Sequence, residues 1–233
     1  GLNYMKIDTS NPTAEIYGVD EQHTMTVKNT SKLFSMMVDG LYKDKYGAVV
    51  RELSANAIDA HVSAGCPEKA FDINVPNHES KFSIRDYGNG LTKDEIVQYF
   101  GRLLESSKEN DNNAVGAYGI GCKSPFSIVD EFMVVSIKDN IKTTVTFVRE
   151  DKGIPIFAVT GQEKTNEPSG TKIIIDDRNT DDWIKAIQTQ LAAFKIKPNT
   201  NIDITYPVIH YMGDLGYVEN KHILKHSTYI DRS

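Results

Sequence analysis

The sequence predicts an α+β protein, a two-layer sandwich in which helices cover one face of a mostly antiparallel, mixed β-sheet. Helical apolar spacing dominates residues 31–64, short strand-like runs follow from residue 132 to residue 175, and a helical pattern returns at residues 181–195. Of the 233 residues, 39% are apolar and 25% are charged. This ordinary globular composition supplies enough apolar material for a real core.

Each predicted helix combines apolar spacing with residues that favour helix ends. Thr30 or Ser31 can cap a first helix, and a second, over residues 48–64, ends at Gly65 with a proline beyond. Thr92 begins a third helix over residues 92–99, with a glutamate at the capping-box position. Further helices are expected at residues 125–129 and 181–195.

Strands are predicted where apolar residues alternate or run together between turn residues. The expected strands cover residues 25–28, 71–75, 81–86, 132–137, 143–148, 154–159, 172–175 and 202–205. These patterns suggest an N-terminal strand or arm over residues 1–30 and a core domain over residues 31–178. Residues 179–233 then form a C-terminal helix and tail, which either closes the domain or leads to a second domain outside this chain.

Charge and cysteine content narrow the function classes. The net charge is −6 and the basic residues form no stripe, so direct nucleic-acid binding is not expected. Cys66 and Cys122 lack metal-binding spacing and suggest a reducing, cytoplasmic setting. No apolar run is long enough to predict a transmembrane segment, so any membrane association is expected to be peripheral, through a partner.

The helix over residues 48–64 carries a polar row opposite its apolar face. Glu52, Asn56 and Asp59 are spaced so that they share one side of the helix. Carboxylates on a mostly buried helix are costly unless they are paired or functional. A functional row and an ordinary solvated face are both compatible with this helix taken alone.

Three glycine-containing segments are candidate ligand sites. Asp86 ends a predicted strand and is followed by Gly88 and Gly90, which allow a ligand close to the backbone, although such turns are common. The segment 116–121 exposes backbone amides suited to an anion, and Lys123 follows it. It is not a P-loop, because Cys122 separates the last glycine from the lysine. A Gly-Thr pair that includes Thr171 enters a late strand.

In this order and spacing, these motifs resemble the N-box, G1, G2 and G3 motifs of the gyrase, chaperone, histidine kinase and MutL (GHKL) ATPases. The resemblance covers roughly residues 48–175. It implies the two-layer Bergerat fold, with ATP and Mg²⁺ as cofactors. Residues 50–61 and 119–126 also look like the rIIA proteins of T-even phages, which are tied to lysis inhibition.

The resemblance implies a role for each matching residue. Glu52 matches the general base that activates the attacking water, and Asn56 matches the Mg²⁺ ligand. Asp86 matches the acceptor of the adenine amino group, and Thr171 matches the threonine that supports it. The other expected nucleotide-binding residues are Asp59, Gly88, Gly90, Gly116, Tyr118, Gly119, Ile120, Gly121 and Lys123.

The resemblance also implies an ATP lid over residues 101–115, an ATP-dependent homodimer, and a protein client from host or phage. The location would be cytoplasmic, in the host cytoplasm if the protein is phage-encoded. An alternative is a nucleotide-regulated binding module with little or no hydrolysis. A histidine kinase is disfavoured because that branch generally carries Asn where Glu52 stands. A topoisomerase subunit is disfavoured by the acidic balance and short length.

Overall fold

The structure, a computed structural model, describes residues 22–24, 43–102, 124–150, 155–212, 215–218 and 222–223. Its helices are α2 (Lys45–Ser63), α3 (Lys93–Arg102), the 3-10 helix η1 (Ser124–Ser127) and α5 (Thr180–Gln190). Its strands are β1 (Gln22–Thr24), β2 (Asp72–Asn74), β3 (Phe82–Arg85), β4 (Glu131–Lys138), β5 (Ile141–Val148), β6 (Ile156–Lys164), β7 (Gly170–Ile175), β8 (Asn199–Thr200), β9 (Ile209–Met212), β10 (Leu215–Val218) and β11 (His222–Ile223).

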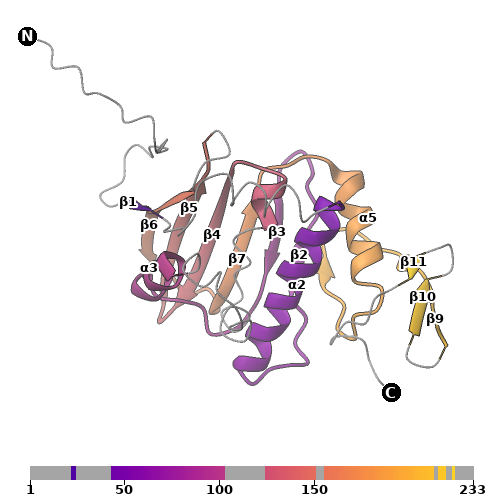
Figure 1. Cartoon of the computed structure of the whole chain (residues 1–233). Helices are drawn as coiled ribbons and strands as arrows, with labels where there is room; N and C mark the ends of the chain where they lie inside the picture. The colour runs from indigo at the N-terminus through magenta and orange to yellow at the C-terminus, as the bar shows by residue number, and fades with distance from the viewer. Residues whose placement is uncertain are drawn as a thin grey trace, which may run out of the picture.

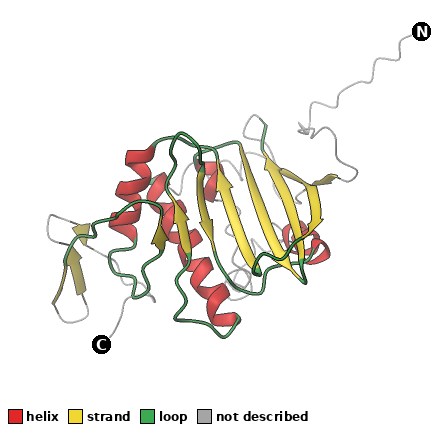
Figure 2. Ribbon diagram, turned by 180° about the vertical axis from the view of Figure 1, so that it is seen from behind, coloured by secondary structure: helices red, strands yellow, loops and turns green. Residues whose placement is uncertain are grey.

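Two layers make up the fold, as the sequence predicts. One sheet has the strand order β1-β6-β5-β4-β7-β3-β2-β8, and β9 to β11 form a second, three-stranded sheet. Every pair in the large sheet is antiparallel except the parallel pair β2 and β8. Helices α2 and α5 lie side by side on one face of the sheet (Figure 1), and the view from behind places the strands in front of them (Figure 2). No described helix is long and apolar enough to cross a membrane.

The predicted elements between residues 48 and 175 match the structure with small changes in their ends. Helix α2 starts earlier, because the side chain of Asp44 accepts a 2.9 Å hydrogen bond from the backbone amide of Gly47. The helix expected at residues 125–129 is the shorter η1. The strand expected at 25–28 and the first helix after residue 31 lie outside the described residues.

Two C-terminal predictions need correction. The helix expected to reach residue 195 ends at Gln190, and Lys197 Nζ donates to the carbonyl oxygens of Ala192 (2.9 Å) and Phe194 (2.5 Å) just beyond it. The strand expected at 202–205 is wrong, since β8 stops at Thr200. The Asn201 side chain bonds both the amide and the carbonyl of Val75, which occupies the groups that a longer ladder would need.

An aromatic row joins the central strands to the helical layer. Phe132, Phe147 and Phe157 are register partners on β4, β5 and β6, and their rings stack with centroids 4.9 and 5.5 Å apart. Phe126 of η1 meets the end of this row edge-on, at 4.9 Å from the Phe132 ring. All four rings are buried, so the row holds η1 against the sheet.

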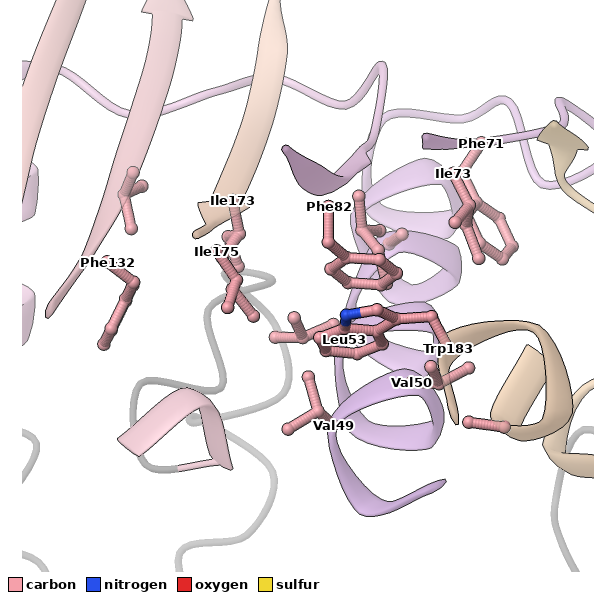
Figure 3. Close-up of a cluster of buried hydrophobic side chains, with 14 of the residues drawn as sticks. Val49, Val50, Leu53, Phe71, Ile73, Phe82, Phe132, Ile173, Ile175 and Trp183 are labelled. Atoms are coloured by element: carbon pink, nitrogen blue, oxygen red, sulfur yellow. The ribbon is translucent and has the colours of Figure 1, made fainter. Parts of the chain in front are cut away.

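Trp183 connects the two large helices to the sheet (Figure 3). Its indole is fully buried, stacks on Phe82 of β3 at 3.5 Å between centroids, and meets Tyr46 of α2 edge-on at 4.8 Å. Its Nε1 donates a 3.0 Å hydrogen bond to Asp177 Oδ2, so the buried polar group is satisfied. Apolar stacking and the indole hydrogen bond therefore help to fix where α5 packs.

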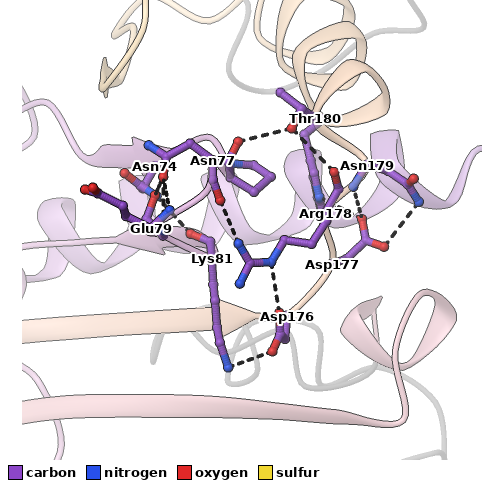
Figure 4. A network of polar contacts seen from close by, with 12 residues as sticks. Asn74, Asn77, Glu79, Lys81, Asp176, Asp177, Arg178, Asn179 and Thr180 are labelled. Atoms are coloured by element: carbon purple, nitrogen blue, oxygen red, sulfur yellow. Dashed lines mark hydrogen bonds and ion pairs between the residues drawn. The ribbon is translucent and has the colours of Figure 1, made fainter.

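A polar network fixes the connection from β7 to α5 (Figure 4). Arg178 donates a 2.6 Å hydrogen bond to the carbonyl of Asn77 in the β2–β3 turn, and Lys81 pairs with Asp176 at 2.8 Å. Thr180, the first residue of α5, donates to the carbonyl of Pro76 at 3.1 Å. Exposed ion pairs contribute little stability, so this network mainly specifies the geometry of the connection.

Replacing Trp183 tests whether it anchors α5. We expect Trp183→Ala to lower the free energy of unfolding by about 3–5 kcal/mol, because a fully buried aromatic side chain is lost. Trp183→Phe keeps a ring against Phe82 and should lose only about 1–2 kcal/mol. Urea unfolding followed by far-ultraviolet circular dichroism measures both changes.

The control for this experiment is Val208→Ala, because Val208 is 61% exposed. Its unfolding free energy should stay within about 0.5 kcal/mol of the wild type. An equally small loss for Trp183→Ala would show that α5 is held by other contacts.

Candidate nucleotide site

Asp86 lies just after β3 and is held by two backbone amides. Its Oδ1 accepts hydrogen bonds from the amide of Gly88 (2.8 Å) and from the amide of Thr171 at the start of β7 (3.1 Å). The Asp86 amide donates in turn to the Thr171 carbonyl at 2.9 Å. The described contacts of the carboxyl group both fall on Oδ1, so Oδ2 remains available to a ligand.

Burial dominates the electrostatics of Asp86, which is 4% exposed. Removal from water raises the pKa of its carboxyl group from 3.8 to about 6, although the amides of Gly88 and Thr171 oppose this shift. A buried acceptor held in one orientation recognises a ligand N–H group well, because the protein has already removed its water.

The segment from Asp86 to Gly90 passes close to the neighbouring strands β7 and β4. Gly170 has φ +132°, and a Cβ there would collide with the Asp86 carbonyl oxygen. Gly90 has φ +65°, and a Cβ there would collide with the carbonyl oxygen of Ile137 on β4. Glycine is required at both positions, because the left-handed region and the small separation each exclude a side chain.

A cavity of about 250 Å³ opens beside the carboxyl group. Its walls come from the end of α2, the segment after β3, the end of β4 and the start of β7. The lining residues are Ala60, Ser63, Asp86, Asn89, Gly90, Leu91, Lys138 and Thr171. The structure thus brings together Asp86, Gly90 and Thr171, which belong to separate motifs in the sequence.

The predicted polar row of α2 extends away from this cavity. Glu52, Asn56 and Asp59 are all partly exposed, while the opposite side of α2 is buried in the core. With a rise of about 1.5 Å per residue, Asn56 lies about 6 Å and Glu52 about 12 Å along the helix axis from Ala60, which lines the cavity. The row therefore leads from the cavity toward the N-terminal half of α2.

His61 joins the end of α2 to the segment after Asp86. The imidazole is fully buried; its Nε2 accepts a 2.8 Å hydrogen bond from the Tyr87 amide, and its Nδ1 lies 2.9 Å from the Lys69 carbonyl oxygen. An amide can only donate, so Nε2 carries no proton and Nδ1–H is the donor. Burial lowers the pKa of His61, which agrees with a neutral ring.

Two cavity-side residues on β4 carry no sequence pattern that marks them. Ser136 is fully buried and lies 3.3 Å from the Thr171 hydroxyl oxygen, and Lys138 lines the cavity. Lys138 Nζ pairs with both carboxylate oxygens of Glu95, at 2.7 and 2.9 Å. Glu95 also accepts from the Thr92 amide at 2.7 Å, so the predicted capping box is present and holds the ion pair in place.

The other predicted nucleotide-binding residues lie outside the described part of the chain. These residues are Gly116, Tyr118, Gly119, Ile120, Gly121 and Lys123. Within the described residues, no cluster of three or more His, Cys, Asp or Glu side chains is arranged to hold a metal ion. The Mg²⁺ role of Asn56 therefore stays a prediction.

The described residues form a two-layer α+β fold with a cavity between the end of α2, the segment after β3, the end of β4 and the start of β7. Residues 45–171 match the family model described as histidine kinase-, DNA gyrase B-, and HSP90-like ATPase. Because the match covers more than half of the chain, this protein belongs to that family and contains a GHKL-type ATP-binding domain.

Chaperone proteins are among the curated relatives. The chain is 25% identical over 174 residues to chaperone protein HtpG of Rickettsia canadensis, which covers 65% of this chain and 27% of the relative. It is 27% identical over 176 residues to HtpG of Clostridium acetobutylicum, which covers 66% of this chain and 27% of the relative. It is 26% identical over 190 residues to HtpG of Rickettsia typhi, which covers 71% of this chain and 29% of the relative. The chain thus spans less than a third of the length of these relatives.

Replacing Asp86 by asparagine should separate stability from binding. The pKa of Asp86 is raised on folding, so its favourable contribution is complete below about pH 4 and is lost as the pH rises through about 6. A neutral Asn avoids the burial of a charge, and we expect Asp86→Asn to raise the unfolding free energy by ~1–3 kcal/mol at pH 8. The gain should shrink at pH 5, and ATP binding should fall because the side-chain amide donates.

Urea unfolding at the two pH values and calorimetric titration with ATP measure these effects. The exposed Asp203→Asn variant removes a similar charge and should change neither quantity noticeably. A loss of stability at pH 8 in Asp86→Asn would contradict the assigned burial cost.

A methyl group at Gly170 should disrupt the site. We expect Gly170→Ala to destabilise the fold by at least about 2 kcal/mol, because it combines a positive φ with a backbone collision. Gly161→Ala on β6 is the matched control, since a Cβ there would lie 3.5 Å from the Thr144 Cβ, an ordinary contact. Chemical denaturation compares the two, and equal losses would refute the steric explanation.

Proposed function

We propose that this site binds ATP together with Mg²⁺ and hydrolyses the γ-phosphate, with Glu52 as general base. The observation that carries the proposal is the buried Asp86 carboxyl group, held by the amides of Gly88 and Thr171 at the wall of the cavity. A purine with an exocyclic amino group suits this acceptor. Gly90 lines the same cavity, and its positive φ lets the segment after Asp86 pass close to β4.

The direction of α2 supports the placement of the remaining groups. With the base in the cavity, the sugar and phosphates would extend along the row Asp59, Asn56 and Glu52. Asn56 offers the amide oxygen that Mg²⁺ accepts as a ligand, and bound Mg²⁺ would neutralise phosphate charge. Glu52, farthest from the cavity, would hold the attacking water and accept its proton. The segment 116–121 and Lys123 would contact the phosphates.

ATP turnover in such a domain would act as a switch. We propose an ATP-dependent homodimer and a protein client, supported by the similarity to chaperone proteins. The proposal extends to a phage rIIA-like role in host interaction, supported by the motifs at residues 50–61 and 119–126. A cytoplasmic location follows from these two roles.

Replacing Glu52 tests the catalytic role. We expect Glu52→Ala to lower the rate of ATP hydrolysis at least about 100-fold, because a general base is lost, while ATP affinity changes little. Phosphate release with Mg²⁺ measures turnover, and calorimetry on the same samples measures binding. Glu68→Ala, which removes an exposed carboxylate just after α2, should hydrolyse ATP at the wild-type rate.

Three other outcomes are informative. Binding without turnover in the wild type would favour a nucleotide-regulated binding module. Equal turnover in the wild type and in Glu52→Ala would remove Glu52 from the mechanism. The absence of ATP binding in the wild type would overturn the proposed function.

A further inference from the structure

The wall of the cavity contains a directed chain of hydrogen bonds that ends at Thr171. Ser136 on β4 and Thr171 on β7 are register partners, so their side chains meet across the two strands. The Leu91 amide donates to Ser136 Oγ at 2.7 Å, and Ser136 Oγ lies 3.3 Å from Thr171 Oγ1. Leu91 and Thr171 both line the cavity, and Ser136 lies fully buried behind them.

The donor and acceptor roles in this series of hydrogen bonds are fixed by its first member. A backbone amide can only donate, so the Leu91 contact uses a lone pair of Ser136 and leaves its hydroxyl hydrogen to find an acceptor. Among the described contacts of Ser136, Thr171 Oγ1 is the acceptor available. A buried hydroxyl strongly favours a satisfied hydrogen, so Ser136 donates to Thr171. The Thr171 hydroxyl hydrogen is then not used toward Ser136 and can be donated to a group in the cavity that Thr171 lines.

We infer that Ser136 is a positioning residue that holds the Thr171 hydroxyl in its donor orientation and thereby strengthens the selection of adenine over guanine. This inference rests on the proposed ATP site. Asp86 presents an acceptor and Thr171 would present a donor on neighbouring positions of one wall. Adenine carries an amino donor beside the N1 acceptor, whereas guanine carries a carbonyl acceptor beside an N1–H donor. Guanine would oppose both groups, and buried polar groups left unpaired are strongly disfavoured.

The test compares affinities for ATP and 1-deaza-ATP, in which a C–H group replaces N1. The wild type should bind ATP about 3–10-fold more tightly, which is the effect of one hydrogen bond. In Ser136→Ala the Thr171 hydroxyl can either donate or accept, so this ratio should fall below the wild-type value and discrimination against GTP should relax. Thr171→Val, which lacks the donor, gives the baseline ratio. Ser136→Thr keeps a hydroxyl and should restore the preference.

The ratio separates positioning from stability, because a general loss of folding affects both nucleotides equally. Ser83→Ala removes another buried serine hydroxyl from the same sheet, on β3, and should keep the wild-type ratio. If Ser136→Ala does not fold, Ser136→Cys offers a much weaker donor and should lower the ratio instead. All titrations use the full chain with Mg²⁺.

An unchanged ratio in folded Ser136→Ala or Ser136→Cys would overturn the inference and leave the proposed function intact. Equal affinity of the wild type for ATP and 1-deaza-ATP would also overturn it, since no donor would then face N1. If the wild type binds neither nucleotide, the proposed function itself fails and the inference fails with it.

Discussion

A carboxylate that is 4% exposed persists in a protein only where the surrounding backbone compensates for the lost water, and Asp86 imposes this requirement on the fold. Two amides, from Gly88 and Thr171, meet its Oδ1, and Thr171 lies 85 residues beyond Asp86 in the chain. The end of β3 and the start of β7 must therefore lie side by side. The pairing of β3 with β7 supplies this proximity, and the cavity opens where the two strands meet.

Glycines make that proximity sterically possible. The segment after Asp86 passes so close to β4 and β7 that neither Gly90 nor Gly170 has space for a Cβ, and both have positive φ. The same two glycines therefore allow both the close packing of the sheet and the narrow shape of the site. The same short separation lets the Ser136 hydroxyl contact both the Leu91 amide in that segment and the Thr171 hydroxyl on the neighbouring strand. A buried residue that does not line the cavity, Ser136, thus orients a hydroxyl group in the cavity wall.

Helix α2 connects this cavity to the core. Its buried side packs on the sheet and on α5, and Trp183 stacked on Phe82 fixes that packing. Its other side carries Glu52 and Asn56, so their positions depend on how the helix is seated. His61 secures the end of α2, because its Nε2 accepts a hydrogen bond from the backbone amide of Tyr87, next to Asp86. A rigid core and a single imidazole therefore define the spacing between the base end and the phosphate end of the proposed site.

Local patterns along the chain are enough to predict the layer architecture and the separate motifs. Helical spacing places Glu52 and Asn56 on one side of α2, and an Asp at a strand end followed by glycines indicates a ligand site, because these relationships are local in the chain. Two features of the site emerge from the fold alone: Ser136 faces Thr171, 35 residues later, and Lys138 lines the cavity. These contacts depend on strand register, which is set by packing over the whole sheet and leaves no pattern around either residue.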